Sequence, residues 1–116
     1  MGKIATTCGR YYGMDRDGNS DRTKQAYELI TKGTGIYAKT LDEAFQSTYE
    51  QKRTDEFIPP YAFLSTAEEN GFVEDNDAVI LWDFREDSIR QIAAPFALPN
   101  FTSFSAHVPS NHFVVT

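Results

Sequence analysis

The feature that most constrains the fold is an uninterrupted apolar run, Ala-Val-Ile-Leu-Trp, at residues 78–82. Such a run without polar alternation is typical of a β-strand that is covered on both faces, as in the parallel sheets of α/β proteins. The run leads through Asp83 and Phe84 to Arg85, and a helical pattern follows. The apolar face of that predicted helix consists of Ile89, Ile92, Ala93, Phe96 and Ala97. A strand followed directly by a helix predicts an α/β fold.

The N-terminal part repeats this order. Residues 4–8, Ile-Ala-Thr-Thr-Cys, predict a buried strand, and a helix is expected with Ser20 as its N-cap and glycine, at Gly33, at its end. Thr40 predicts the start of another helix, because Glu43 three residues later completes a capping box.

The remaining strands are shorter. The prolines at residues 59–60 exclude a central strand, so we expect an edge strand at residues 61–64. Residues 72–73 resemble one arm of a hairpin, and residues 101–104 and 112–116 predict two short strands. The expected fold is therefore a small, mainly parallel or mixed sheet with about three helices. A chain of 116 residues accommodates one domain at most.

Arginines follow both strand–helix junctions. Arg10 and Arg16 belong to the segment Gly-Arg-Tyr-Tyr-Gly-Met-Asp-Arg-Asp at residues 9–17, and Arg85 follows the second strand. If the two strands are parallel neighbours, these side chains converge on one edge, where ligands of α/β proteins bind. Guanidinium groups bind phosphate or carboxylate in a bidentate way. The alternative is that the first two arginines pair with nearby acids, namely Asp15, Asp17 or Asp21.

Other candidate sites are weaker. Asp55 and Glu56 form an acidic pair, for which we favour a solvated turn or a helix cap over catalysis. The spacing of His107 and His112 does not favour a metal site. Cys8 is the single cysteine of the chain, so an internal disulfide is excluded. We expect it to be a buried apolar residue in a reducing cytoplasm.

Composition excludes several classes of partner. The formal net charge of −6 argues against binding to nucleic acid or to an anionic membrane. The sequence contains no apolar run long enough to span a bilayer and does not open with a signal-peptide pattern.

The segment at residues 9–17 closely resembles a motif of the cofactor-independent phosphoglycerate mutases. Further matching segments follow in order at residues 21–23, 26–27, 54–57, 77–80, 83–85 and 113–116. The resemblance spans nearly the whole chain, but it implies only the C-terminal half of the family's transferase, or substrate-binding, domain. Residues 1–116 would then form a partial, incomplete α/β domain.

This resemblance implies a role in the interconversion of 3-phosphoglycerate and 2-phosphoglycerate in glycolysis. The family's arginines bind the substrate, which makes Arg10, Arg16 and Arg85 candidate substrate-binding residues, with Arg90 as a less certain one. Ser88 stands where the family has a further arginine, and Asp83 stands where it usually has asparagine.

The family's phosphatase domain supplies the serine nucleophile and two manganese ions, which are implied for the full-length enzyme. No catalytic residue, metal ligand or cofactor is expected in this chain. The expected partners are phosphoglycerate or a similar small anion and the missing phosphatase domain. An uncovered sheet edge would also favour a homo-oligomer.

Two hypotheses remain open at this point. The chain is either the substrate-binding portion of a phosphoglycerate mutase, inactive in isolation, or a non-catalytic module. Such a module would bind a small phosphorylated acid or mediate a protein interaction.

Overall fold

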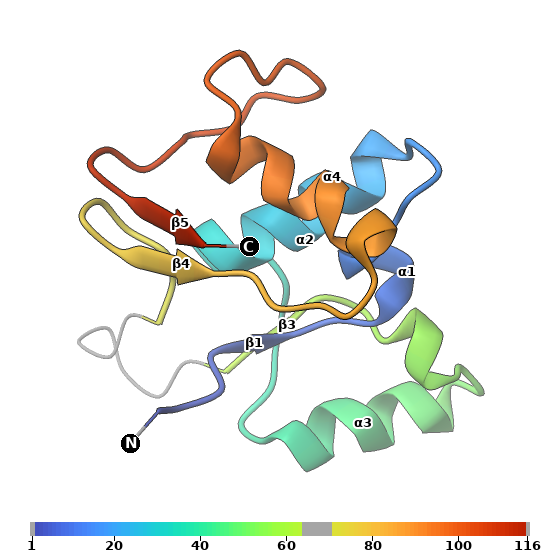
Figure 1. The fold of residues 1–116 in the computed structure, drawn as a ribbon. Helices are drawn as coiled ribbons and strands as arrows, with labels where there is room; N and C mark the ends of the chain where they lie inside the picture. Colours follow the sequence, from blue (N-terminus) through green and yellow to red (C-terminus); the bar gives the residue numbers. More distant parts are fainter. Residues whose placement is uncertain (1, 64–70, 116) are drawn as a thin grey trace.

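A computed structural model describes residues 2–63 and 71–115 (Figure 1). The helices in this part are α1 (Arg10–Gly13), α2 (Ser20–Lys32), α3 (Leu41–Glu50), α4 (Glu86–Ala97) and the 3₁₀-helix η1 (Asp55–Phe57). The strands are β1 (Thr6–Thr7), β2 (Ile36–Tyr37), β3 (Tyr61–Ala62), β4 (Ala78–Ile80) and β5 (Phe113–Val115). The predicted α/β class with small mixed sheets is confirmed.

The strands form two separate sheets. In the first sheet, β3 lies between β1, with which it is antiparallel, and β2, with which it is parallel. In the second, β4 and β5 are parallel. The hypothesis that the strands at residues 4–8 and 78–82 are parallel neighbours is therefore wrong, because β1 and β4 belong to different sheets.

The prediction of an edge strand after Pro60 is also wrong. β3 is central because the proline contributes its carbonyl group, which accepts a hydrogen bond of 2.8 Å from the amide of Ile36. The amide that proline lacks is not needed at this position. Residue 64, the end of the predicted strand, lies outside the described residues.

Helices α2 and α4 cover one face of the β4–β5 sheet (Figure 1). The rings of Tyr27 and Phe96 are 5.0 Å apart between the two helices, and Val79 of β4 packs against them. This cluster is the larger of two cores. The smaller one lies beneath α3 and consists of Ala38, Ala44, Ile58 and Tyr61.

The other face of the β4–β5 sheet is open. The register places Ala78 beside Phe113 and Ile80 beside Val115, and all four residues are exposed. Ile80 is 73% exposed, and Trp82 beyond the strand is 79% exposed. The prediction that residues 78–82 are covered on both faces is therefore wrong for this chain alone.

Helix boundaries follow the predicted caps closely. Gly33 ends α2 with a positive φ of 67°, and the hydroxyl of Thr40 accepts a hydrogen bond from the amide of Glu43 at the start of α3. The N-cap of α2 is Asn19, one residue before the predicted Ser20. Helix α4 follows its predicted apolar face, although Ala97 is exposed.

Two predicted strands are absent from the described residues. At residues 72–73 the chain is not a strand, although the amide of Val73 donates to the carbonyl of Ile30 at the end of α2. Residues 101–104 form a loop whose Phe104 ring lies 5.6 Å from that of Tyr27. In both segments, packing against α2 replaces strand pairing.

Candidate anion-binding site

Helix α1 places Arg10 against η1. The preceding Gly9 donates its amide to the carbonyl of Ile58 at 2.8 Å. A Cβ atom on Gly9 would lie only 2.2 Å from the carbonyl oxygen of Glu56, so glycine allows this close approach. The Nη2 atom of Arg10 then lies 2.6 Å from Oε2 of Glu56. Arg10 therefore begins a short helix and does not lie on the loop that the sequence predicts.

Asp15 anchors the loop between α1 and α2. Only 6% of it is exposed, and its carboxylate accepts hydrogen bonds of 2.8 Å from the amide and side chain of Asn19 and from Nε2 of Gln91. Arg22 adds an ion pair of 3.3 Å. Burial alone would raise the pKa of Asp15, but these hydrogen bonds and the Arg22 charge hold that pKa below its ordinary value.

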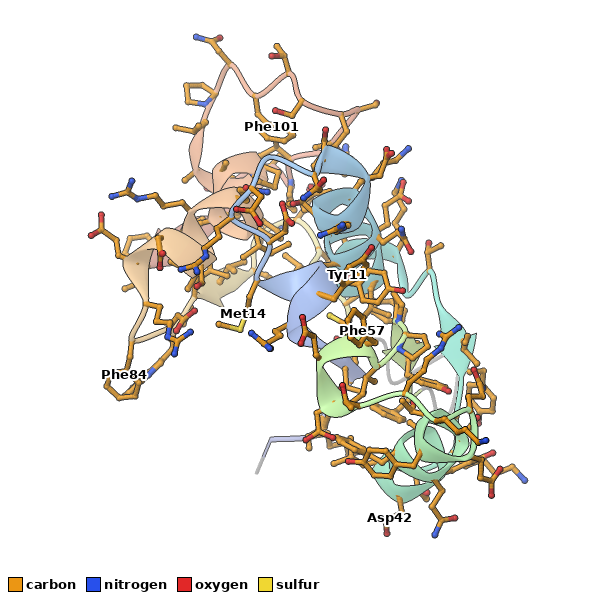
Figure 2. The ribbon with its side chains drawn as sticks, turned by 90° about the vertical axis from the view of Figure 1, so that its right-hand side faces the viewer. Tyr11, Met14, Asp42, Phe57, Phe84 and Phe101 are labelled. Atoms are coloured by element: carbon orange, nitrogen blue, oxygen red, sulfur yellow. The ribbon has the colours of Figure 1, made fainter. Side chains whose placement is uncertain are left out.

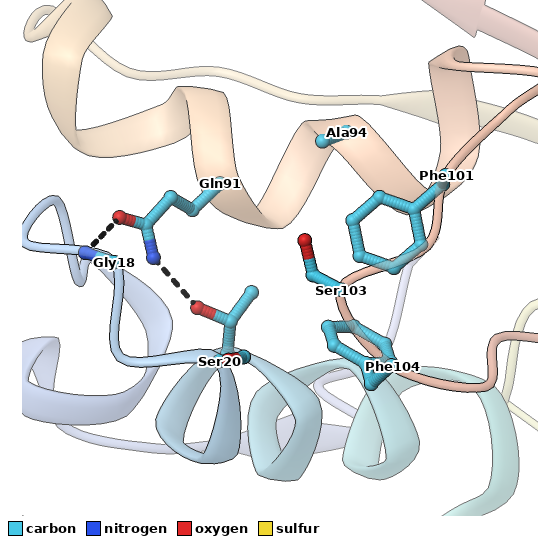
Figure 3. A pocket seen from close by; sticks show the side chains of 8 residues that line it. Gly18, Ser20, Gln91, Ala94, Phe101, Ser103 and Phe104 are labelled. Atoms are coloured by element: carbon cyan, nitrogen blue, oxygen red, sulfur yellow. Dashed lines mark hydrogen bonds between the residues drawn. The ribbon is translucent and has the colours of Figure 1, made fainter.

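Gln91 connects α4 to the same loop. Its Oε1 atom accepts a hydrogen bond of 2.9 Å from the amide of Gly18 (Figure 3). Its Nε2 atom donates a hydrogen bond of 3.0 Å to the hydroxyl of Thr23 on α2. Together with the Asp15 contact, these bonds hold the loop that carries Arg16 against the helix that follows Arg85. In Figure 3 the Gln91 side chain spans the space between α4 and the loop.

A hollow of about 210 Å³ lies between these elements. Arg22 forms part of its wall, with its guanidinium carbon 3.9 Å from the centre of the Tyr11 ring. In Figure 2, Met14 lies between α1 and the segment that carries Phe84. The lining residues are Arg10, Tyr11, Met14, Asp15, Arg16, Asp17, Arg22, Glu56, Arg85 and Ser88.

The hollow brings together three of the four arginines that the sequence suggested: Arg10, Arg16 and Arg85. They converge because α1 and its loop pack beside the start of α4, and not because two strands are neighbours. Arg90 lies elsewhere, where it forms an ion pair with Glu86 and lines a groove along α4. Ser88 faces the hollow, and Arg90 is two residues further, which corresponds to a rotation of about 200° around the helix.

Two of the converging arginines are paired with acids, but not with the acids that the sequence suggested. Arg10 pairs with Glu56, and Nη1 of Arg16 lies 2.6 Å from Oδ2 of Asp87. The hydrogen bond from Arg16 lowers the pKa of Asp87. In the part of the chain that the structure describes, Arg85 forms no ion pair. Exposed pairs of this kind contribute little to the stability of a protein.

Sequence reasoning missed Arg22 and Gln91, and it interpreted Glu56 as part of a solvated turn or a helix cap. Arg22 belongs to residues 21–23, a segment that matches the family, so its presence in the site could have been predicted from the sequence. The contact between Glu56 and Arg10 joins residues 46 positions apart, and no local pattern predicts it. Asp83 does what asparagine could also do, because its Oδ1 atom accepts a hydrogen bond of 2.9 Å from the amide of Arg85.

No cluster of three histidine, cysteine, aspartate or glutamate side chains that could hold a metal ion occurs among residues 2–63 and 71–115. Within the same ranges, no helix is long and apolar enough to cross a membrane.

The fold and the hollow together define a small α/β module with a site lined by four arginines and three acidic side chains. The whole chain, residues 1–116, matches the family model described as the N-terminus of BPG-independent PGAM. The chain belongs to this family of 2,3-bisphosphoglycerate-independent phosphoglycerate mutases.

Individual relatives agree. A mutase of this name from Shewanella amazonensis is 41% identical over 116 residues, which cover 98% of this chain and 23% of the relative. One from Coxiella burnetii strain RSA 493 is 44% identical over 108 residues, covering 92% and 21%. A Leishmania mexicana phosphoglycerate mutase, crystallised at low cobalt concentration, has a TM-score of 0.86 and 25% identity, covering 97% of this chain and 21% of that one. The chain thus spans about a fifth of the length of these relatives.

Proposed function

We propose that this chain is the substrate-binding portion of a phosphoglycerate mutase, and that it corresponds to the C-terminal half of the transferase domain. The observation that carries this proposal is the convergence of Arg10, Arg16 and Arg85 on one hollow. These side chains reach it from α1, from the following loop and from the start of α4. A phosphate and a carboxylate on one small molecule offer enough acceptor oxygens for all three.

In this proposal the chain binds and orients the substrate and does not itself transfer the phosphoryl group. Phosphoryl transfer requires a positioned nucleophile and charge stabilisation at the transferring group. Those groups would come from the remainder of the parent enzyme. The isolated chain is expected to convert no 3-phosphoglycerate into 2-phosphoglycerate, with or without added manganese.

Titration of the isolated chain with 3-phosphoglycerate tests the substrate-binding role. Two or three charge-assisted hydrogen bonds contribute roughly 1.5–3 kcal/mol each before association costs, so a dissociation constant in the millimolar range is expected. Arg10→Ala and Arg85→Ala should each weaken binding by about tenfold or more.

Arg90→Ala is the matched control, because it also removes an arginine charge but one outside the hollow. It should leave the affinity nearly unchanged. Absence of binding at tens of millimolar, or an equal loss in all three variants, would contradict the proposal.

The open face of the β4–β5 sheet favours a second candidate function, a module that mediates a protein interaction. Two exposed aromatic side chains, Trp82 and Phe84, follow β4 in the chain and are 79% and 94% exposed. In this alternative the hollow is a structural ion-pair cluster, and the three arginine variants alter stability without altering any binding of phosphoglycerate.

A further inference from the structure

We propose that Glu56 and Asp87 act as internal competitors of the bound anion. On this view they occupy Arg10 and Arg16 until a multiply charged anion displaces them. This inference rests on the proposed function, because it concerns the same hollow. The inference gives a role to these two carboxylates, which the proposed binding of substrate by arginines does not explain.

The two carboxylates come from separate elements. Glu56 lies in η1, and Asp87 lies in the first turn of α4. Each places one carboxylate oxygen 2.6 Å from a guanidinium nitrogen. The paired residues are 46 and 71 positions apart, so neither contact follows from local chain geometry.

Asp15 shows what a structural carboxylate in this hollow looks like. It is buried and accepts four hydrogen bonds, which leaves no room for exchange with a ligand. By contrast, the side chains of Arg16 and Asp87 are both 55% exposed, and those of Arg10 and Glu56 are 61% and 36% exposed. Exposed single pairs are weak and are exchanged at little cost.

The charge balance indicates which anion can displace the pairs. Four arginines line the hollow, and three acidic side chains, two aspartates and Glu56, line it with them. Asp87 adds a fourth carboxylate through Arg16. A monoanion that replaces one carboxylate exchanges equal charges and gains little. A phosphate dianion has more charge and enough oxygens to contact Arg10 and Arg16 together.

The test is titration of the full chain with inorganic phosphate at about pH 8, where phosphate is mainly dianionic, and with acetate as the monoanion. The variants are Glu56→Gln, Asp87→Asn and the double variant, which keep the side-chain shapes. Glu28→Gln is the matched control: it removes the same charge and breaks an exposed ion pair, with Lys32, outside the hollow.

Each single variant should bind phosphate about two- to fivefold more tightly, and the double variant about tenfold. Glu28→Gln should change the affinity by less than about 1.5-fold. The unaltered chain should bind phosphate more tightly than acetate. Urea unfolding of each variant verifies that it folds.

The outcomes separate the two proposals. Unchanged or weaker phosphate binding in the variants would overturn the competitor role and indicate that the carboxylates orient the arginines, while leaving the proposed function intact. Phosphate binding by the double variant but not by the unaltered chain would support the competitor role and contradict substrate binding by the isolated chain. No phosphate binding by any protein at tens of millimolar would reject both.

Discussion

Replacement of Gln91 by Met should destabilise the fold more than any other change of a single polar side chain on α4. Gln91 makes one hydrogen bond to the ionised Asp15 and two neutral ones, to Gly18 and Thr23. A hydrogen bond to a charged group contributes about 1.5–3 kcal/mol and a neutral one about 0.5–1.5 kcal/mol. Asp15 retains its bonds to Asn19 in the variant, so we expect a net loss of about 2–3 kcal/mol.

Urea unfolding measures this loss as a lower midpoint with an unchanged slope. Gln25→Met is the matched control, because Gln25 is exposed and, among the described residues, its side chain makes only a long hydrogen bond of 3.4 Å to the carbonyl of Asp21. This control should cost less than about 0.5 kcal/mol. An equal effect of the two variants would refute the view that Gln91 holds the loop in place.

Gln91→Glu provides an independent check through pH. The substitution places a second carboxylate where an amide nitrogen now lies 2.8 Å from an oxygen of Asp15. Like charges at this distance raise the pKa of the introduced carboxyl group. Stability that depends on its protonated form is present at low pH and is lost as pH rises through the raised pKa. The deficit relative to the unaltered chain should therefore grow between about pH 4 and pH 7, and a constant deficit would contradict the reasoning.

Three further predictions concern other parts of the molecule. Gly9→Ala should destabilise the chain by about 1–3 kcal/mol in urea unfolding, since the added Cβ would meet the carbonyl oxygen of Glu56; an effect below about 0.5 kcal/mol would show that η1 moves aside freely. Burial raises the pKa of Cys8 from 9.0 to about 11, so the native state keeps the thiol protonated and stability is lost as pH rises above about 9. Between about pH 8 and about pH 10.5, the free energy of unfolding in urea should fall by about 2 kcal/mol in the unaltered chain, and this fall should be absent from Cys8→Ala. An equal fall in both proteins would disprove the role of Cys8. The open sheet face should cause self-association at micromolar concentrations, and Trp82→Ser should shift light scattering toward the monomer; a chain that is monomeric throughout this range would contradict that expectation.

Much of the helical structure follows from local rules in the sequence. The apolar positions of α2 and α4 recur at helical spacing, and Gly33 and Thr40 mark ends where the backbone requires glycine or a capping oxygen. Sheet order does not follow from such rules, because it depends on contacts between distant segments. The central position of β3 was missed for this reason. Proline was expected to exclude a central strand because it lacks an amide hydrogen, but here Pro60 takes part in pairing through its carbonyl group.

The candidate site shows the same division. The spacing of Arg10 and Arg16 and the position of Arg85 suggested an anion site, and the structure does bring these residues to one hollow. The reason given for their convergence was wrong, since β1 and β4 are not neighbours. The hollow is instead assembled by side-chain contacts. The least predictable of these involve Glu56, which lines the hollow, and Gln91, which bonds to Asp15 and Gly18 of the adjoining loop.

The open face of the β4–β5 sheet explains why one strong sequence rule failed here. An apolar run such as residues 78–82 predicts cover on both faces, and Val79 does lie against α2 and α4. On the opposite face Ile80 and Val115 lie side by side and exposed, which is unfavourable for apolar side chains in water. The relatives are four to five times as long as this chain, since it covers 21–23% of each. If further residues of a parent mutase cover this face, the rule holds for the whole enzyme and fails only for the part described here. Addition of such a segment should then abolish the self-association that the isolated chain is expected to show, while leaving the arginine-lined hollow at the start of α4 unchanged.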